Sequence, residues 1–246
     1  MTEVANNNNY IERPIHRSSS VLSTNGNNRR KKWTINTTDG LNSDIMDEER
    51  NKFRVYEYLC HVGEAKEWME RMLKKELAPI SEFENQLQYG ITLAELARLF
   101  SQESVKKIFE SEKLQFRHSD NINYFFDALR KIKFPEIFYF ETTDCYEKKN
   151  SPKVIYCLHA LSHFLELRGY GKAVRDLVGK LEFTDNEVQA QYDNFKENNI
   201  NLPTFNNLEN KLHEELKKND DTSSINFDKE DSSDLDEFSI YSFINI

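Results

Sequence analysis

Two histidines, His159 and His163, have the spacing that most resembles a metal site in this sequence. They lie four residues apart in a stretch with helical periodicity, so both imidazoles would lie on one face of a helix and could share a metal ion. The glutamate that follows the first histidine of the H-E-x-x-H zinc motif is missing, and no third ligand is evident nearby. The pattern therefore predicts no metal at this pair.

Other residue types that carry chemistry also lack the surroundings that catalysis needs. Gly169-Tyr170-Gly171-Lys172 and Gly179-Lys180 lack the spacing and the preceding strand of a phosphate-binding loop, so they predict turns at helix ends. No serine or cysteine lies in a nucleophile-elbow sequence, and the paired carboxylates fall on charged outer faces, where water would solvate them. We therefore expect no enzymatic activity and no cofactor.

The elements that hold these residues read as helices. From Glu48 onward, apolar residues recur at intervals of three and four, which places them on one face. The clearest amphipathic segment is 64–77, which buries Trp68 and Met69. Its outer face is predicted to hold charged residues that can form i,i+4 pairs. They are Glu64, Lys66, Glu67, Glu70, Arg71, Lys74 and Lys75.

The next two helices are marked by a cap and by their apolar content. Ser81 and Glu84 have capping-box spacing, which predicts a short helix that ends at Gly90 in a left-handed cap. Residues 91–100 are apolar on nearly all sides, which is typical of a helix covered by its neighbours. We take this segment as the central buried helix.

Four further helices follow from start and stop signals. Ser119 or Asp120 is expected to cap a helix that ends before Phe134-Pro135, because the residue before proline avoids helical backbone angles. Ser151-Pro152 predicts the N-cap and first residue of a long helix that ends at Gly169. Thr184 and Glu187 form another capping box, and Leu208, Leu212 and Leu216 indicate a last surface helix. No alternating run is long enough to predict a sheet.

The two ends of the chain differ from the middle in composition and charge. The asparagine- and serine-rich leader, residues 1–45, and the acidic tail, residues 206–246, are predicted to be mostly disordered. Residues 46–205 are predicted to form one helical domain with a C-terminal helical extension. The chain carries a net charge of −9, which disfavours general nucleic-acid binding.

The cysteines and the length of the apolar runs indicate the cellular compartment of the protein. Cys60, Cys145 and Cys157 are odd in number and lack C-x-x-C spacing, which indicates reduced thiols and an intracellular protein. No run of about 18 apolar residues is present, so we expect no membrane insertion. These features predict a cytoplasmic protein.

Four motifs, in order, resemble the calponin-homology domain at the N-terminus of IQGAP proteins. They are Tyr56-Glu57-Tyr58-Leu59-Cys60-His61-Val62-Gly63-Glu64-Ala65-Lys66-Glu67-Trp68-Met69-Glu70, Leu114 to Asn123, Phe134 to Phe140, and the long run from Thr143 through Asn150-Ser151-Pro152-Lys153-Val154-Ile155-Tyr156-Cys157-Leu158-His159-Ala160-Leu161 to Ser162. The resemblance covers residues 48–205. It implies an all-α, compact calponin-homology bundle with a central buried helix and disordered tails.

The resemblance has two departures from the family pattern. Cys145 stands where the family usually has leucine, a tolerable small apolar replacement at a buried turn. The chain also ends before any IQ motif or GAP-related region, so we expect a fragment of a longer scaffold and do not carry over the roles of those regions. The asparagine-rich leader looks fungal, and such fungal proteins serve the cytokinetic actomyosin ring.

The resemblance implies binding to actin filaments (F-actin) through the first and last long helices, near residues 64–77 and 152–166. The candidate contacts are Lys66, Lys74, Lys75, Lys148, Lys149 and Lys153. The expected location is the cytoskeleton, in actin cables, patches or the contractile ring. Two alternatives stay open: an interaction module that binds calmodulin or a myosin light chain through an amphipathic helix, and a microtubule-binding domain.

Overall fold

The computed structural model describes residues 43–111 and 117–223, and within them the secondary structure is helical with no strand. The helices are α1 Ser43–Leu73, α2 Ile80–Leu87, α3 Ile91–Phe100, α4 His118–Lys131, α5 Thr142–Tyr146, α6 Ser151–Leu167, α7 Asp185–Glu197 and α8 Leu208–Ser223, with the short 3-10 helices η1 Gln102–Ser104 and η3 Glu136–Phe138. The leader's basic stretch Arg29 to Lys32, the motif residues Leu114 to Phe116 and the apolar end from Phe238 to Ile246 lie outside the described residues. Within the described helices, none is both long and apolar enough to cross a membrane.

Helix α1 is longer than the sequence predicted. It begins at Ser43 rather than Glu48 and runs without a break through both expected segments, a length of 31 residues. Gly63 lies inside it, where a Cβ atom would come within 2.6 Å of Leu181 Cδ1, so glycine allows a later loop to approach the helix closely. The helix ends at Leu73 because Lys74 takes a positive φ of 53°. Lys74 and Lys75 therefore lie beyond the helix on which they were placed.

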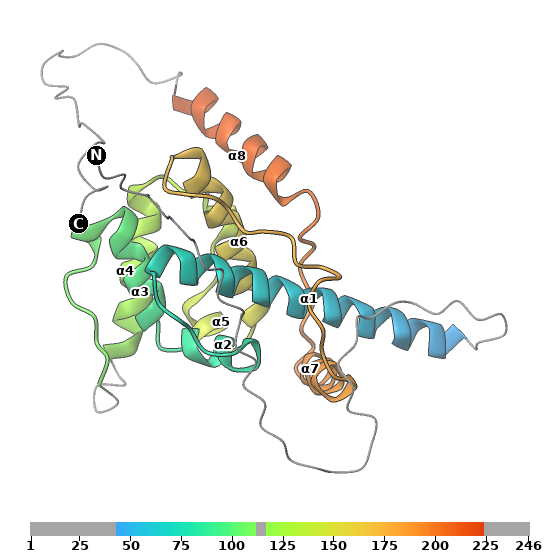
Figure 1. Cartoon of the computed structure of the whole chain (residues 1–246). Helices are drawn as coiled ribbons and strands as arrows, with labels where there is room; N and C mark the ends of the chain where they lie inside the picture. The colour runs from blue at the N-terminus through green and yellow to red at the C-terminus, as the bar shows by residue number, and fades with distance from the viewer. Residues whose placement is uncertain (1–42, 112–116, 224–246) are drawn as a thin grey trace, which may run out of the picture.

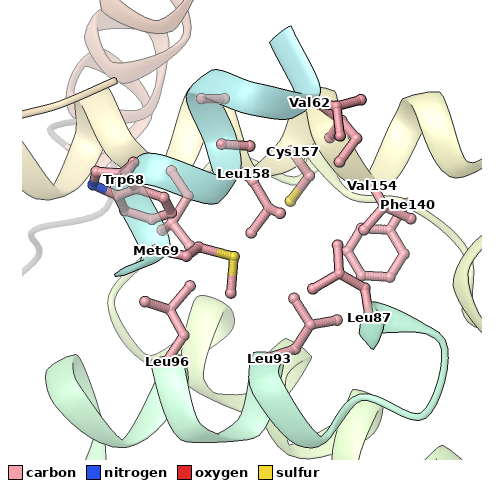
Figure 2. Close-up of a cluster of buried hydrophobic side chains, with 14 of the residues drawn as sticks. Val62, Trp68, Met69, Leu87, Leu93, Leu96, Phe140, Val154, Cys157 and Leu158 are labelled. Carbon is pink, nitrogen blue, oxygen red and sulfur yellow. The ribbon is translucent and has the colours of Figure 1, made fainter. Parts of the chain in front are cut away.

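The core surrounds α3, which packs mainly against α4 and also touches α1 and α2. Figure 2 shows Leu93 and Leu96 of this helix pointing toward Met69 of α1 and Leu158 of α6. Both leucines are fully buried, which confirms the prediction of a central buried helix. Leu99 is the exception, since 44% of it is exposed and α3 therefore has one open side.

One of the predicted capping boxes is confirmed. Thr184 Oγ1 accepts a hydrogen bond from Glu187 N at 3.2 Å, and the Glu187 side chain accepts one from Thr184 N at 2.7 Å. The other box is wrong: α2 starts at Ile80 after Pro79, so Ser81 is already inside the helix. A side chain can cap only from the residue before the first helical turn, and the N-cap lies two positions earlier, at Pro79, so that bond is absent.

Two other helices also start earlier than the sequence predicted. Helix α4 begins at His118 with Arg117 at its N-cap, and α6 begins at Ser151 with Asn150 at its N-cap. Neither helix start has a side-chain cap bond. Pro152 still lies in the first turn of α6, and Gly169 follows that helix with the positive φ expected of a helix-end turn.

Gly90 shows why the α2–α3 corner needs glycine. Its φ of +66° is left-handed, as predicted, and its N–H donates to Leu87 O at 2.9 Å. A Cβ atom there would lie 2.8 Å from the backbone nitrogen of Ile122, which cannot move without shifting α4. The residue therefore serves both the turn and the close packing of α4 against it.

The last two helices extend the bundle. Figure 1 shows α7 beside the N-terminal half of α1, and α8 running along the outside of α6. Leu208 and Leu212 of α8 are buried, so this helix is docked on the domain and is more than the surface helix that was predicted. It also continues to Ser223, inside the tail of residues 206–246 that was predicted to be mostly disordered.

Candidate functional site

Three of the six candidate lysines gather where α5 leads into α6. Lys148 and Lys149 lie in the connection and Lys153 in the first turn of α6. Lys149 and Lys153 are 61% and 49% exposed, and each faces one carboxylate: Glu147 at 2.9 Å and Asp144 at 3.4 Å, respectively. Lys148 is also exposed and donates to Asn85 Oδ1 of α2 at 3.0 Å. We call Lys148, Lys149 and Lys153 the α6 lysine group.

The other three lysines are less uniform. Lys66 is mostly buried at 18% exposure and pairs with Glu70 at 2.5 Å, while Glu70 also accepts a hydrogen bond from Leu77 N. Lys75 pairs with Glu95 of α3, and Lys74 is exposed with no ion pair among the described residues. Lys66 therefore holds the end of α1 in place, and only Lys74 and Lys75 present charge outward. The contacts of the six lysines go to different elements and do not join them into one patch.

Glu64 is the largest departure from the expected outer face of residues 64–77. It is 4% exposed, and its Oε1 accepts a hydrogen bond from Leu177 N at 2.7 Å. Of the i,i+4 pairs that the charged residues of this segment can form, Glu67–Arg71 is present at 2.9 Å, and Glu70 pairs with Lys66 rather than with Lys74. Helical periodicity misplaced Glu64 because the loop around Leu177 covers that side of α1.

Glu64 belongs to a cluster with His61 and His159, which no pattern in the sequence predicted. Glu64 Oε2 lies 2.7 Å from His61 Nδ1 and 3.8 Å from His159 Nε2. His159 Nε2 also lies 2.9 Å from His61 O, so that nitrogen carries a proton and donates to the carbonyl. The ligand atoms of the three side chains all lie within 4.8 Å of one another. His61 and Glu64, three residues apart on one helix, were the signal in the sequence that could have pointed to the cluster.

His159 and His163, the pair that the sequence suggested, lie in different environments. His159 turns toward α1, where burial and the nearby His61 lower the pKa of its imidazole to about 3. His163, one turn later, is half-buried, and burial lowers its pKa as well. Both rings border a surface cavity of about 450 Å³ that also involves Glu57, His61, Glu64 and Asp176.

The three cysteines are buried thiols with no disulfide, and all lie in the described part of the chain. Burial raises the pKa of Cys145 to about 12 and that of Cys60 to about 11. A thiol needs a lowered pKa to act as a nucleophile, so these two have the opposite tuning. Cys145 Sγ donates to Leu87 O at 3.3 Å, which is how cysteine fits the buried turn where leucine is usual.

Comparison with known proteins agrees with this architecture. The family model of the calponin homology (CH) domain matches residues 59–166. The chain is 45% identical over 168 residues to the Ras GTPase-activating-like protein rng2 of Schizosaccharomyces pombe, covering 68% of this chain and 11% of that protein. It is 42% identical over 185 residues to human Ras GTPase-activating-like protein IQGAP2, covering 72% of this chain and 12% of that protein. The chain thus spans about a tenth of the length of these relatives.

A solved structure gives the same result for the fold. The crystal structure of the calponin-homology domain of Rng2 from Schizosaccharomyces pombe is 46% identical and superposes with a TM-score of 0.60, covering 65% of this chain and 98% of that one. The match extends over nearly all of a solved calponin-homology domain at an identity well above the level at which only the fold is shared. This chain therefore belongs to the calponin-homology family, and its domain is of the IQGAP type.

Proposed function

We propose that this chain binds actin filaments through its calponin-homology domain and tethers a cytoskeletal scaffold to them. The observation that carries the proposal is the α6 lysine group, three exposed amines gathered on the last long helix of an IQGAP-type domain and the connection before it. The proposed location is the actin cytoskeleton in the cytoplasm, with the cytokinetic ring as the specific structure. The proposed role is to bind and tether, with no catalytic step.

Electrostatics must explain how a chain of net charge −9 approaches an acidic filament. Beyond a Debye length of about 8 Å at physiological salt, surface charges are largely screened, so the local patch matters more than the total. Lys149 and Lys153 are held near Glu147 and Asp144, but their side chains stay about half exposed or more, and their amines can turn toward a partner. We propose these lysines as the leading contacts, with Lys74 and Lys75 as a second set.

Burial disfavours the alternative in which segment 64–77 binds calmodulin or a myosin light chain. A target helix of that kind offers its apolar face to the partner. Here Trp68 is 1% exposed and Met69 is fully buried, both within the domain core. Binding by this segment would require the bundle to open. Microtubule binding has no comparable argument against it and is kept as an arm of the test.

The test is co-sedimentation of the full chain with actin filaments at low and high salt, beside a microtubule control. The charge-reversal variant Lys148→Glu/Lys149→Glu/Lys153→Glu is expected to bind actin at least about fivefold more weakly at low salt. The reason is that three exposed ion pairs between these lysines and acidic groups of the filament would contribute about 1 kcal/mol to binding together. Its binding should also depend less on salt.

A matched control reverses three other basic residues near the end of α4, with Arg130→Glu/Lys131→Glu/Lys133→Glu. Arg130 and Lys131 also face carboxylates, Asp127 and Glu103, so the control repeats the change in charge and the loss of local pairs. Equal weakening by both triple variants would reduce the effect to net charge and remove the α6 lysine group from the account. Pelleting with microtubules and not with actin would reject the proposed function itself.

A further inference from the structure

The cluster of His61, Glu64 and His159 has a composition that the proposed actin-binding role does not use. Two imidazoles and one carboxylate converge from two helices, α1 and α6, and the last two residues are nearly inaccessible. Two histidines and a glutamate are one of the ligand sets with which proteins bind Zn²⁺. We propose that these three residues form a binding site for one Zn²⁺ ion.

The distances fit a zinc centre after small movements. Zn²⁺ binds histidine nitrogen and carboxylate oxygen at about 2.0–2.2 Å, which places two tetrahedral ligand atoms about 3.3 Å apart. Glu64 Oε2 is 2.7 Å from His61 Nδ1 and 3.8 Å from His159 Nε2. The first separation must widen and the second must shorten by about half an ångström, and the separation between His61 Nδ1 and His159 Nε2, which is at most 4.8 Å, must shorten by up to about 1.5 Å. Side-chain rotations of the two histidines can supply these movements.

Charge favours a cation at this position. Glu64 is 4% exposed, and among the described residues its ion-pair partners are the two imidazoles, with no lysine or arginine. A buried carboxylate is costly unless a positive charge or several hydrogen bonds compensate it. Leu177 N supplies one hydrogen bond, to Oε1, and leaves Oε2 directed at the histidines. This bond also fixes the carboxylate, as partners of metal ligands commonly do.

The surroundings supply entry and a fourth ligand. The cavity of about 450 Å³ beside the cluster connects it to the surface, and the walls carry His163 and Asp176 as well as the three ligands. Phe205 also lines this cavity, with its ring stacked on His61 at 4.1 Å between centroids. A water molecule or one of the two further side chains can complete four-coordination in the cavity.

Protons must move when the ion binds. His159 Nε2 now donates to His61 O, and the hydrogen between His61 Nδ1 and Glu64 occupies the position that the metal would take. Each ring must free its inner nitrogen by carrying its proton on the other nitrogen, or by losing a proton if it is charged.

The experiment is calorimetric titration of the full chain with Zn²⁺ after treatment with a chelator and its removal. We expect one ion per chain, an increase in melting temperature with Zn²⁺, and visible absorption typical of four-coordinate Co²⁺ when Co²⁺ replaces it. His61→Asn and His159→Gln keep an amide N–H near the lost ring N–H but cannot replace the imidazole, and each should lower Zn²⁺ affinity at least tenfold.

The control variant is His213→Gln on α8, which lies outside the cluster and should bind Zn²⁺ as the unaltered chain does. If either histidine variant fails to fold, judged by circular dichroism without metal, Glu64→Gln replaces it, because the amide oxygen can still accept from Leu177 N. A loss of less than tenfold in the cluster variants, or the same loss in His213→Gln, would overturn the proposal. Actin co-sedimentation does not enter this test, so the two proposals fail separately.

Discussion

At the scale of single residues, burial makes His159 a contributor to pH-dependent stability. The pKa of its imidazole is lowered to about 3 in the folded chain, first by desolvation and then by His61, with a smaller contribution from His163. The unfolded value is about 6.5. A neutral ring is therefore favoured in the folded state, and the unfolded state binds a proton more readily.

The sign of this effect gives a first prediction. The contribution of His159 is full above pH 6.5 and is lost as the pH falls toward 3, by about 2 kcal/mol at pH 5. In chelator-containing buffer, urea unfolding at pH 7.5 and pH 5 should show a smaller loss of stability for His159→Gln than for the unaltered chain. His213→Gln serves as the control, and a His159→Gln loss as large as that of the unaltered chain would refute the assignment.

Two leucines three residues apart on α3 provide a second prediction. Leu96 is fully buried in the core, whereas Leu99 is 44% exposed. Leu96→Ala should lower the free energy of unfolding by about 2–5 kcal/mol because it leaves a cavity, and Leu99→Ala should change it by less than about 1 kcal/mol. Chemical denaturation measures both values. Similar losses would mean that α3 has no open side.

At the scale of elements, two sequence motifs with capping-box spacing have different outcomes, because only one of them lies at the start of its helix. Thr184 has its reciprocal bonds with Glu187, and Ser81 has none because α2 begins one residue before it. The two sequence signals look alike. The difference arises from Pro79, whose extended backbone precedes α2 and fixes where the first turn begins.

This difference gives a third prediction. Thr184→Ala should destabilise the chain by about 1 kcal/mol through loss of the cap, while Ser81→Ala should be nearly neutral. The readout is the midpoint of thermal unfolding, measured for both variants under the same conditions. An equal effect of the two substitutions would contradict the assigned start of α2.

At the scale of the whole molecule, the helices beyond the family match are part of the folded unit. The calponin-homology match ends at residue 166, yet Phe195 of α7 packs against Tyr58 at 5.2 Å between rings, and Leu212 of α8 is fully buried. Lys211 of the same helix lies over the rings of Phe138 and Tyr156. Segment 185–216 therefore shares its core with the domain.

The fourth prediction tests this shared core. Leu212→Ala should lower the global stability by about 2–5 kcal/mol in a single unfolding transition, as for a core leucine. A chain that ends at residue 205 should lose still more, because it exposes the surface of α6 that α8 covers. An unchanged midpoint for Leu212→Ala, measured by circular dichroism in urea, would mean that α8 is independent of the domain.

The sequence alone determined the helical class, the buried α3, the capping box at Thr184 and the family, because periodicity and linear motifs record local geometry and burial on one helix face. The predicted domain bounds, residues 46–205, stay a prediction. Helix α1 begins before them, at Ser43, and α8 ends after them, at Ser223. Tertiary structure alone decided that Glu64 is buried, that His159 faces His61 rather than His163, and that Lys66 is engaged while the α6 lysine group is exposed. The physical reason is that each of these outcomes depends on segments distant in the chain, such as the loop at Leu177 and the ring of Phe205, which cover a face that periodicity assigns to water.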